Sequence, residues 1–154
     1  MNRLVAITVA CVAILCSPLL TEAAAPTKDQ AAVVNFAQSM AVRALDFEQG
    51  NLDSLQDAWD DFTLDGWNEF MKHMRGYVDA KGVPQFSQSF VPSGDPVVID
   101  EKEGIVHLTI RGKLKQTRDS SSTTYDHVEI DVRVGGTPIK IQHLEPTIVL
   151  LRSK

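Results

Sequence analysis

Hydrophobic residues in the first third of the chain recur at every third or fourth position, which is the period of an α-helix. The apolar positions are Val33, Phe36, Met40, Ala44 and Phe47. Further small and branched residues lie beside them and widen the apolar face, so most of the helix must be covered by other parts of the fold. Thr27 or Asp29 is suited to cap its start. The pattern therefore predicts one long helix that runs to about Glu48.

A second, short helix is expected after Gly50-Asn51. Ser54 is its predicted N-cap, because a serine hydroxyl can accept a hydrogen bond from a free backbone N–H of the first turn. Its inward-facing side chains are predicted to be Leu55, Ala58, Trp59 and Phe62. The aspartates between them face outward, and they lack the DxDxDG spacing of a calcium-binding loop.

The segment 62–77, FTLDGWNEFMKHMRGY, is the most strongly patterned helix of the chain. Thr63 is its predicted N-cap and Gly76 its predicted end. One apolar stripe is made by Trp67, Phe70, Met71 and Met74. Gly66 costs a helix about 1 kcal/mol relative to alanine, so its presence predicts close packing at that point. Such a stripe is typical of a helix that fills the concave face of a sheet, and the alternative is a stripe that lines a ligand pocket.

After Gly82 the period of the pattern changes to two, which is typical of half-buried strands. The apolar segments cover residues 86–90, 97–99, 106–114, 128–134 and 148–151. Turn-forming residues separate them at 92–94, 100–104 and 119–123, and Pro146 is expected to break or bend the last strand. Because each longer strand has one apolar and one polar face, the pattern indicates an antiparallel sheet.

Gly135-Gly136 is the sharpest turn signal, because two consecutive glycines suit a two-residue hairpin loop. Such a loop fixes the register of the flanking strands. It would place Val134 opposite Thr137, Val132 opposite Ile139, Ile130 opposite Ile141 and Val128 opposite His143. If the inward–outward alternation of this strand also holds across the polar loop at 119–123, Ile110 lies opposite Ile130 and Arg111 lies opposite Glu129.

Helices followed by a meander of four to five strands predict an α+β fold, in which the N-terminal helices pack on a curved antiparallel sheet. Each class of element has one apolar face, and these faces cover one another only if the sheet curls around the helices. We expect residues 31–154 to form this single domain around one core.

The first 23 residues have the three-part composition of a secretory signal peptide, with Arg3 before an apolar run and small residues at its end. Residues 24–30 are then a short tether. An uncleaved membrane anchor over residues 4–20 is the alternative, although the uninterrupted apolar run is shorter than the ~20 residues of a spanning helix. We therefore expect the protein in the periplasm, with membrane association only if the signal remains uncleaved.

Composition and motifs exclude several kinds of chemistry. Both cysteines, Cys11 and Cys16, lie in the signal segment, so the mature chain has no disulfide and no thiol chemistry. The net charge is −5 with or without that segment, and there is no basic stripe with interleaved aromatic residues, which argues against a nucleic-acid partner. The chain lacks a Gly-rich phosphate loop, a GxSxG motif and a zinc-type histidine spacing. We expect no enzyme activity, no cofactor and no metal site.

Three polar side chains are the candidates for a pocket between the sheet and the helices, namely Asp46, Tyr125 and His143. The hairpin register turns His143 toward the apolar face. There it is either a hydrogen-bonded core histidine or, less favoured, an acid/base in a pocket. Two other histidines are predicted on polar strand faces beside cations, His107 near Arg133 and His127 near Lys113.

Several segments together resemble the DotI/IcmL/TraM family of type IVB secretion and conjugation systems. The most specific is a Phe-Thr-x-x-Gly-Trp-x-x-Phe pattern, formed here by Phe62, Thr63, Gly66, Trp67 and Phe70. The others are the helix end at 44–47, the segment VPSGDPVVID…GIVHLTIRGKLKQT at 91–117, and TTYDHVEIDVRV at 123–134. Together they span nearly all of the mature chain.

The resemblance implies a periplasmic domain of the nuclear transport factor 2-like kind, a cystatin-like cone, similar to the periplasmic scaffold subunit of type IVA machines. It also implies a structural role without catalytic residues. We expect contacts with apparatus proteins, and self-association of the chain, through the outer face of the sheet or an exposed edge. Family members usually carry a cytoplasmic segment and a spanning helix before this domain, whereas only three residues precede the apolar run here. The departure favours an accessory or stand-alone relative. The alternative function is a periplasmic small-ligand-binding protein or enzyme that uses the pocket between sheet and helices.

Overall fold

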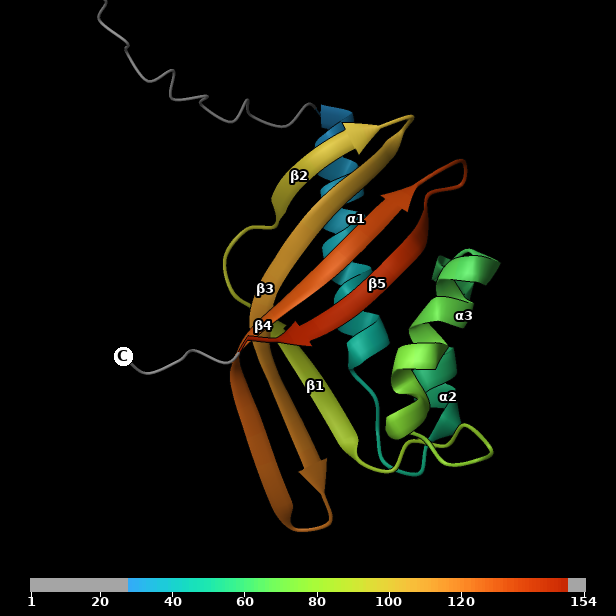
Figure 1. Cartoon of the computed structure of the whole chain (residues 1–154), viewed down its shortest axis with the longest axis vertical. Helices are drawn as coiled ribbons and strands as arrows, with labels where there is room; N and C mark the ends of the chain where they lie inside the picture. The colour runs from blue at the N-terminus through green and yellow to red at the C-terminus, as the bar shows by residue number, and fades with distance from the viewer. Residues whose placement is uncertain (1–27, 150–154) are drawn as a thin grey trace, which may run out of the picture.

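The computed structural model describes residues 28–149, in which three α-helices precede a five-stranded antiparallel sheet (Figure 1). The helices are α1 (Lys28–Leu45), α2 (Leu52–Gln56) and α3 (Leu64–His73). The strands are β1 (Ser87–Pro92), β2 (Val97–Lys102), β3 (Ile105–Arg118), β4 (Ser121–Gly135) and β5 (Lys140–Ile148). Single 3₁₀ turns follow α2 at Trp59–Asp61 and α3 at Met74–Gly76. The predicted α+β fold class is confirmed. The predicted signal segment and most of the tether lie outside the described residues.

The long strands β3 and β4 form the centre of the sheet. The strand order is β1-β3-β4-β5, and β2 also pairs with β3, on the half of that strand that β1 does not reach. Helix α1 lies across one face of the sheet, while α2 and α3 stand beside β5 (Figure 1). Three small residues of α1, Ala37, Ala41 and Ala44, are fully buried, which lets the helix approach the sheet closely. The core therefore lies between α1, α3 and the apolar face of the sheet.

Helix α3 is anchored to the edge strand β5 at its first turn. The Thr63 hydroxyl accepts a hydrogen bond from the Gly66 N–H at 3.1 Å, which confirms the predicted N-cap. The Thr63 N–H in turn donates to the Ile141 carbonyl at 2.8 Å. A Cβ on Gly66 would lie 2.7 Å from the Ile141 carbonyl oxygen, so the predicted close packing at this glycine is confirmed. Trp67 and Phe70, on the same helix, are buried.

The segments before α3 differ from the prediction in three places. Helix α1 ends at Leu45 because Phe47 leaves the helix and exchanges two backbone hydrogen bonds with Gln88 of β1, at 3.0 and 2.8 Å. Asn51, and not Ser54, caps α2, since the Asn51 side chain accepts from the Ser54 N–H at 3.3 Å. Trp59 is 48% exposed rather than inward-facing. Its ring packs on the outer side of Trp67, with ring centroids 5.3 Å apart.

The predicted pairing of β3 with β4 is confirmed. Ile110 lies opposite Ile130 inside the fold, and Arg111 lies opposite Glu129 outside it. The Arg111 Nε donates to Glu129 Oε1 at 2.8 Å. The predicted polar loop at 119–123 is shorter than expected, because β4 already begins at Ser121.

The predicted register of the β4–β5 hairpin is wrong. Gly135 pairs with Lys140, so the loop holds the four residues 136–139 rather than two. Pro138 lies in this loop and has no backbone N–H, so the strand ladder cannot continue through it. A bulge follows, because the pairing moves from Val134–Ile141 to Arg133–His143 and leaves Gln142 as the extra residue.

The bulge turns His143 onto the polar face of the sheet, whereas the predicted register placed it on the apolar face. Pro146 does not end β5, since the strand continues to Ile148. Proline is tolerated there because β5 is an edge strand. Across residues 28–149, none of the helices has both the length and the apolar character needed to cross a membrane.

Candidate functional surface

The three predicted pocket residues lie in different parts of the fold. Asp46 is exposed just after α1 and lines an open hollow of about 410 Å³ that includes neither of the other two. Tyr125 is half-buried on β4, opposite Leu114. His143 is on the polar face of β5. Because the bulge moved His143 to the other side of the sheet, the structure does not bring this residue toward the apolar face as expected.

A hollow of about 290 Å³ does lie between the helices and the sheet, but it has other walls. Its lining residues are Leu45, Met74, Tyr77, Gln88, Leu114, Val128, Pro146, Thr147 and Ile148. Gln88 is the one buried polar residue of the described part of the chain. Its amide is already used, because Nε2 donates to the Leu45 carbonyl at 3.1 Å and Oε1 accepts from Gln116 at 2.9 Å. This lining offers apolar contact and contains no carboxylate or imidazole.

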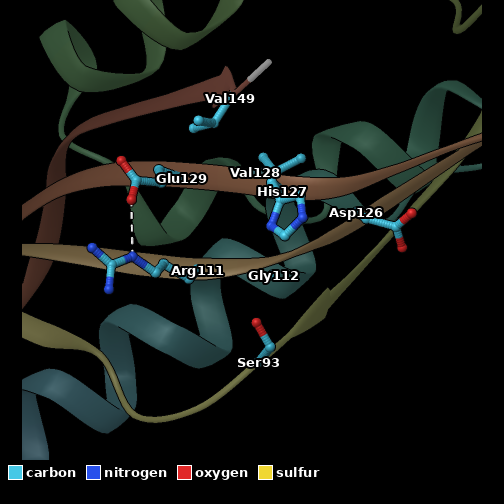
Figure 2. A pocket seen from close by; sticks show the side chains of 8 residues that line it. All are labelled: Ser93, Arg111, Gly112, Asp126, His127, Val128, Glu129 and Val149. Carbon is cyan, nitrogen blue, oxygen red and sulfur yellow. Dashed lines mark hydrogen bonds and ion pairs between the residues drawn. The ribbon is translucent and has the colours of Figure 1, made fainter. Parts of the chain in front are cut away.

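A smaller hollow of about 200 Å³ opens on the polar side where β3 and β4 meet the end of β5 (Figure 2). Figure 2 shows Arg111 and Glu129 paired along one wall, with His127 and Asp126 further along β4. Asp126 is also paired, since Lys113 donates to it at 2.8 Å, and this hydrogen bond holds the pKa of Asp126 below its ordinary value. The charges of this hollow are therefore largely balanced within the protein itself.

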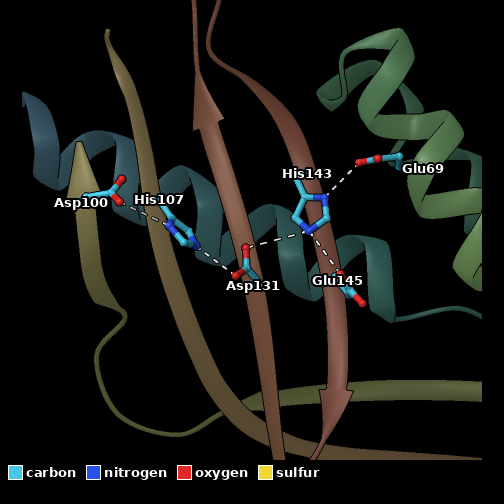
Figure 3. Close-up of polar contacts among 6 residues, drawn as sticks. All are labelled: Glu69, Asp100, His107, Asp131, His143 and Glu145. Carbon is cyan, nitrogen blue, oxygen red and sulfur yellow. Dashed lines mark hydrogen bonds and ion pairs between the residues drawn. The ribbon is translucent and has the colours of Figure 1, made fainter. Parts of the chain in front are cut away.

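A row of alternating imidazole and carboxylate groups crosses the polar face from β2 to α3 (Figure 3). The members are Asp100 on β2, His107 on β3, Asp131 on β4, His143 and Glu145 on β5, and Glu69 on α3. His107 Nε2 lies 3.0 Å from Asp131 Oδ2, and His143 Nδ1 lies 3.0 Å from Glu69 Oε2. We call these six residues the histidine–carboxylate row. Sequence reasoning missed it, because the bulge that places His143 in the row leaves no signal in the hydrophobic pattern.

His107 does lie opposite Arg133, as predicted, but its ring contacts carboxylates. The contact to Glu69 is the part of the row that joins a helix to the sheet. The hydrogen bond from His143, followed by the charges of His143, Lys72 and His73, holds the pKa of the Glu69 carboxyl below its ordinary value. Within residues 28–149, no cluster of three or more His, Cys, Asp or Glu residues is arranged to hold a metal ion.

Three of the exposed apolar side chains lie on β1 and β2. Val91 is 62% exposed, Val97 44% and Ile99 55%. Strand β2 pairs only with β3, so its other edge has no strand partner in the described part of the chain. We call Val91, Val97, Ile99 and this open edge the β1–β2 edge. In the sequence, the only indication of this surface was a short apolar segment with Val97 and Ile99, which is too short to be a strand buried on both faces.

Comparison with known proteins gives structural matches only. No protein-family model matches the chain, and no curated protein matches it by sequence. The fold is similar to that of an IcmL-like type IV secretion system protein from Legionella pneumophila, with a TM-score of 0.67 and 12% identity. The match covers 84% of this chain and 98% of the Legionella chain.

Two further solved structures share the fold. The periplasmic domain of DotI matches with a TM-score of 0.65 and 16% identity, over 82% of this chain and 99% of the DotI chain. CagV, a VirB8 homologue of the type IV secretion system of Helicobacter pylori, matches with a TM-score of 0.58 and 16% identity, over 77% of this chain and 99% of the CagV chain. At the level of fold, the resemblance seen in the sequence is therefore confirmed: this chain has the nuclear transport factor 2-like fold of these type IV secretion proteins.

Proposed function

We propose that this protein is a non-enzymatic scaffold or accessory component of a type IV secretion or conjugation apparatus, related to the DotI/IcmL/TraM family. The observation that carries the proposal is the match in fold to three type IV secretion proteins, which extends over 98–99% of each of their chains. Fold alone is a weak guide to function. Here the motif Phe62–Phe70 adds an independent likeness in sequence, and it lies at the point where α3 joins β5.

We place its action in the periplasm. The support is the signal-like composition of residues 1–23, together with a structural neighbour that is itself a periplasmic domain. Contacts with apparatus proteins, or with further copies of this chain, follow from the scaffold role.

The β1–β2 edge is the surface we assign to those contacts. An unpaired strand edge offers free backbone N–H and C=O groups to another chain. Val97 and Ile99 add apolar area that a partner would remove from water, at about 25 cal/mol per Å². The polar face further along the sheet is less suited to this role, because Arg111 and Lys113 are already paired with carboxylates of β4.

Site-specific photo-crosslinking in the host cell tests this assignment. A photoreactive residue at Ile99 is expected to give discrete adducts with secretion or conjugation subunits, or with a second copy of the chain. The matched control is the same residue at Leu64, which is 65% exposed on α3 and lies away from the β1–β2 edge. Adducts at Leu64 but none at Ile99 would move the interface to α3, and the absence of adducts at either position would count against a scaffold role.

One observation favours the alternative function. The 290 Å³ hollow between sheet and helices is near the lower limit of small-molecule pockets, which are about 300–1,000 Å³. Its apolar lining suits a small apolar ligand better than a charged substrate. A small apolar ligand bound in this hollow, with no apparatus subunits recovered beside the protein, would favour the alternative over the scaffold role.

A further inference from the structure

We propose that the contact between Glu69 and His143 is a proton-operated clasp, which holds α3 against β5 when His143 is positively charged and loosens that side of α3 when His143 is neutral. The inference does not depend on the scaffold role, because it rests on the contacts of the histidine–carboxylate row alone. It concerns how firmly one helix is attached to the sheet.

Both ring nitrogens of His143 face carboxylates. Nδ1 lies 3.0 Å from Glu69 Oε2, while Nε2 lies 3.5 Å from Glu145 Oε2 and 4.0 Å from Asp131 Oδ1. A neutral imidazole has one N–H, so in either tautomer a nitrogen lone pair faces a carboxylate. Only the imidazolium donates on both sides. The observed arrangement therefore fits the charged form of His143.

The second histidine of the row repeats this arrangement. His107 Nε2 lies 3.0 Å from Asp131 Oδ2, and its Nδ1 lies 3.8 Å from Asp100 Oδ2. Asp131 stands between the two rings, and its Oδ1 is buried without a hydrogen-bond partner, 4.0 Å from His143 Nε2. When both rings are neutral, the row holds four carboxylates and two N–H donors. Loss of the protons therefore leaves like charges facing one another across β4 and β5.

The other charged groups around the clasp do not replace His143. On α3, Lys72 and His73 act on Glu69 through charge alone, without a hydrogen bond. On β4, Arg133 is the cross-strand neighbour of both histidines and is exposed. His143 is therefore the group that ties α3 to the polar face of the sheet, and its side chain is only 19% exposed.

The clasp acts in a limited pH window. The upper limit is set by loss of the second imidazole proton, and histidine is the side chain that most often changes charge near neutral pH. At the lower limit Glu69 becomes protonated. Because its pKa is lowered, the carboxylate stays ionised to a lower pH than that of an ordinary glutamate. The contact is therefore lost when His143 gives up its second proton or when Glu69 takes one up. The first turn of α3 stays attached throughout, because the Thr63–Ile141 hydrogen bond and the packing of Gly66 involve no titrating group.

Amide hydrogen exchange of the full chain, followed by mass spectrometry at pH 6 and pH 8 and corrected for intrinsic rates, tests the proposal. The backbone amides of residues 64–73 are expected to exchange through local opening about two- to five-fold less often at pH 6 than at pH 8. This is the size of effect that a partly exposed ion pair has. Peptides from β3 serve as the internal reference. His143→Gln and Glu69→Gln are each expected to remove the α3-specific difference, whereas His127→Gln, a histidine outside the row, keeps it.

Tryptophan fluorescence gives a second readout, because both tryptophans lie at α3: Trp67 is on the helix and the Trp59 ring packs against it at a tilt. The wild-type signal is expected to change between pH 6 and 8, and the change should be absent in Glu69→Gln. Glu69 is half-exposed, so this variant keeps the fold even if His143→Gln does not. An α3 protection that is equal at both pH values, or a pH difference that survives in Glu69→Gln, would overturn the clasp.

Discussion

Replacing Gly66 by alanine is expected to lower the free energy of unfolding by up to about 2 kcal/mol, although alanine is the better helix former. The new Cβ would lie 2.7 Å from the Ile141 carbonyl oxygen and 2.8 Å from that of Gln142. Both contacts are to backbone, which cannot rotate away, so α3 or β5 must shift. Overpacking of this kind costs about 1–3 kcal/mol, and the roughly 1 kcal/mol gain in helix propensity offsets it only in part. Urea unfolding followed by circular dichroism measures the change.

Gly76→Ala is the matched control. Gly76 ends the 3₁₀ turn after α3, and a Cβ there would meet nothing within 4 Å. The free energy of unfolding should therefore change by less than about 0.5 kcal/mol, as for most surface substitutions. Equal effects of the two substitutions would show that the Gly66–Ile141 contact is not what joins α3 to the sheet.

Phe70→Ala is expected to have the larger effect, a loss of about 3–5 kcal/mol, which is the usual cost of removing a fully buried aromatic ring. Phe70 has no exposed surface, and its ring centroid lies 5.4 Å from that of Phe62 and 5.6 Å from that of Trp67. Removal of the ring leaves a cavity between α3 and the sheet that the backbone cannot close. A thermal unfolding midpoint lower by many degrees, measured by calorimetry, is the expected sign.

Leu64→Ala is the control for this substitution, since Leu64 is on the same helix but 65% exposed. It should change stability by less than about 0.5 kcal/mol. A Phe70→Ala variant as stable as Leu64→Ala would contradict the placement of the aromatic cluster in the core.

The parts of the fold that the sequence predicted are those governed by local chemistry. The N-cap at Thr63 and the close packing at Gly66 follow from residue types whose backbone needs are specific. The pairing of Ile110 with Ile130 follows from two long alternating strands, where a slip by one residue would turn every apolar side chain outward.

The parts that the sequence did not predict depend on competition between distant segments. Two glycines favoured a tight turn at 135–136, but Pro138 removed a ladder donor and the bulge at Gln142 reversed the parity of β5. The placement of His143, and with it the histidine–carboxylate row, could not be read from a period-two pattern. Trp59 was predicted inside as part of the inner face of a short helix with Leu55, Ala58 and Phe62, whereas the 3₁₀ turn at 59–61 leaves it outside against Trp67.

The central claim is the role in a secretion or conjugation apparatus. The most direct test is affinity purification of the tagged protein from its own host after mild cross-linking in the cell, with the co-purifying proteins identified by mass spectrometry. Type IV secretion or conjugation subunits are expected to be enriched over a control with an unrelated exported protein. Recovery of the protein alone from the soluble periplasm would contradict it, and the apolar hollow between helices and sheet would then be the site at which to search for a ligand.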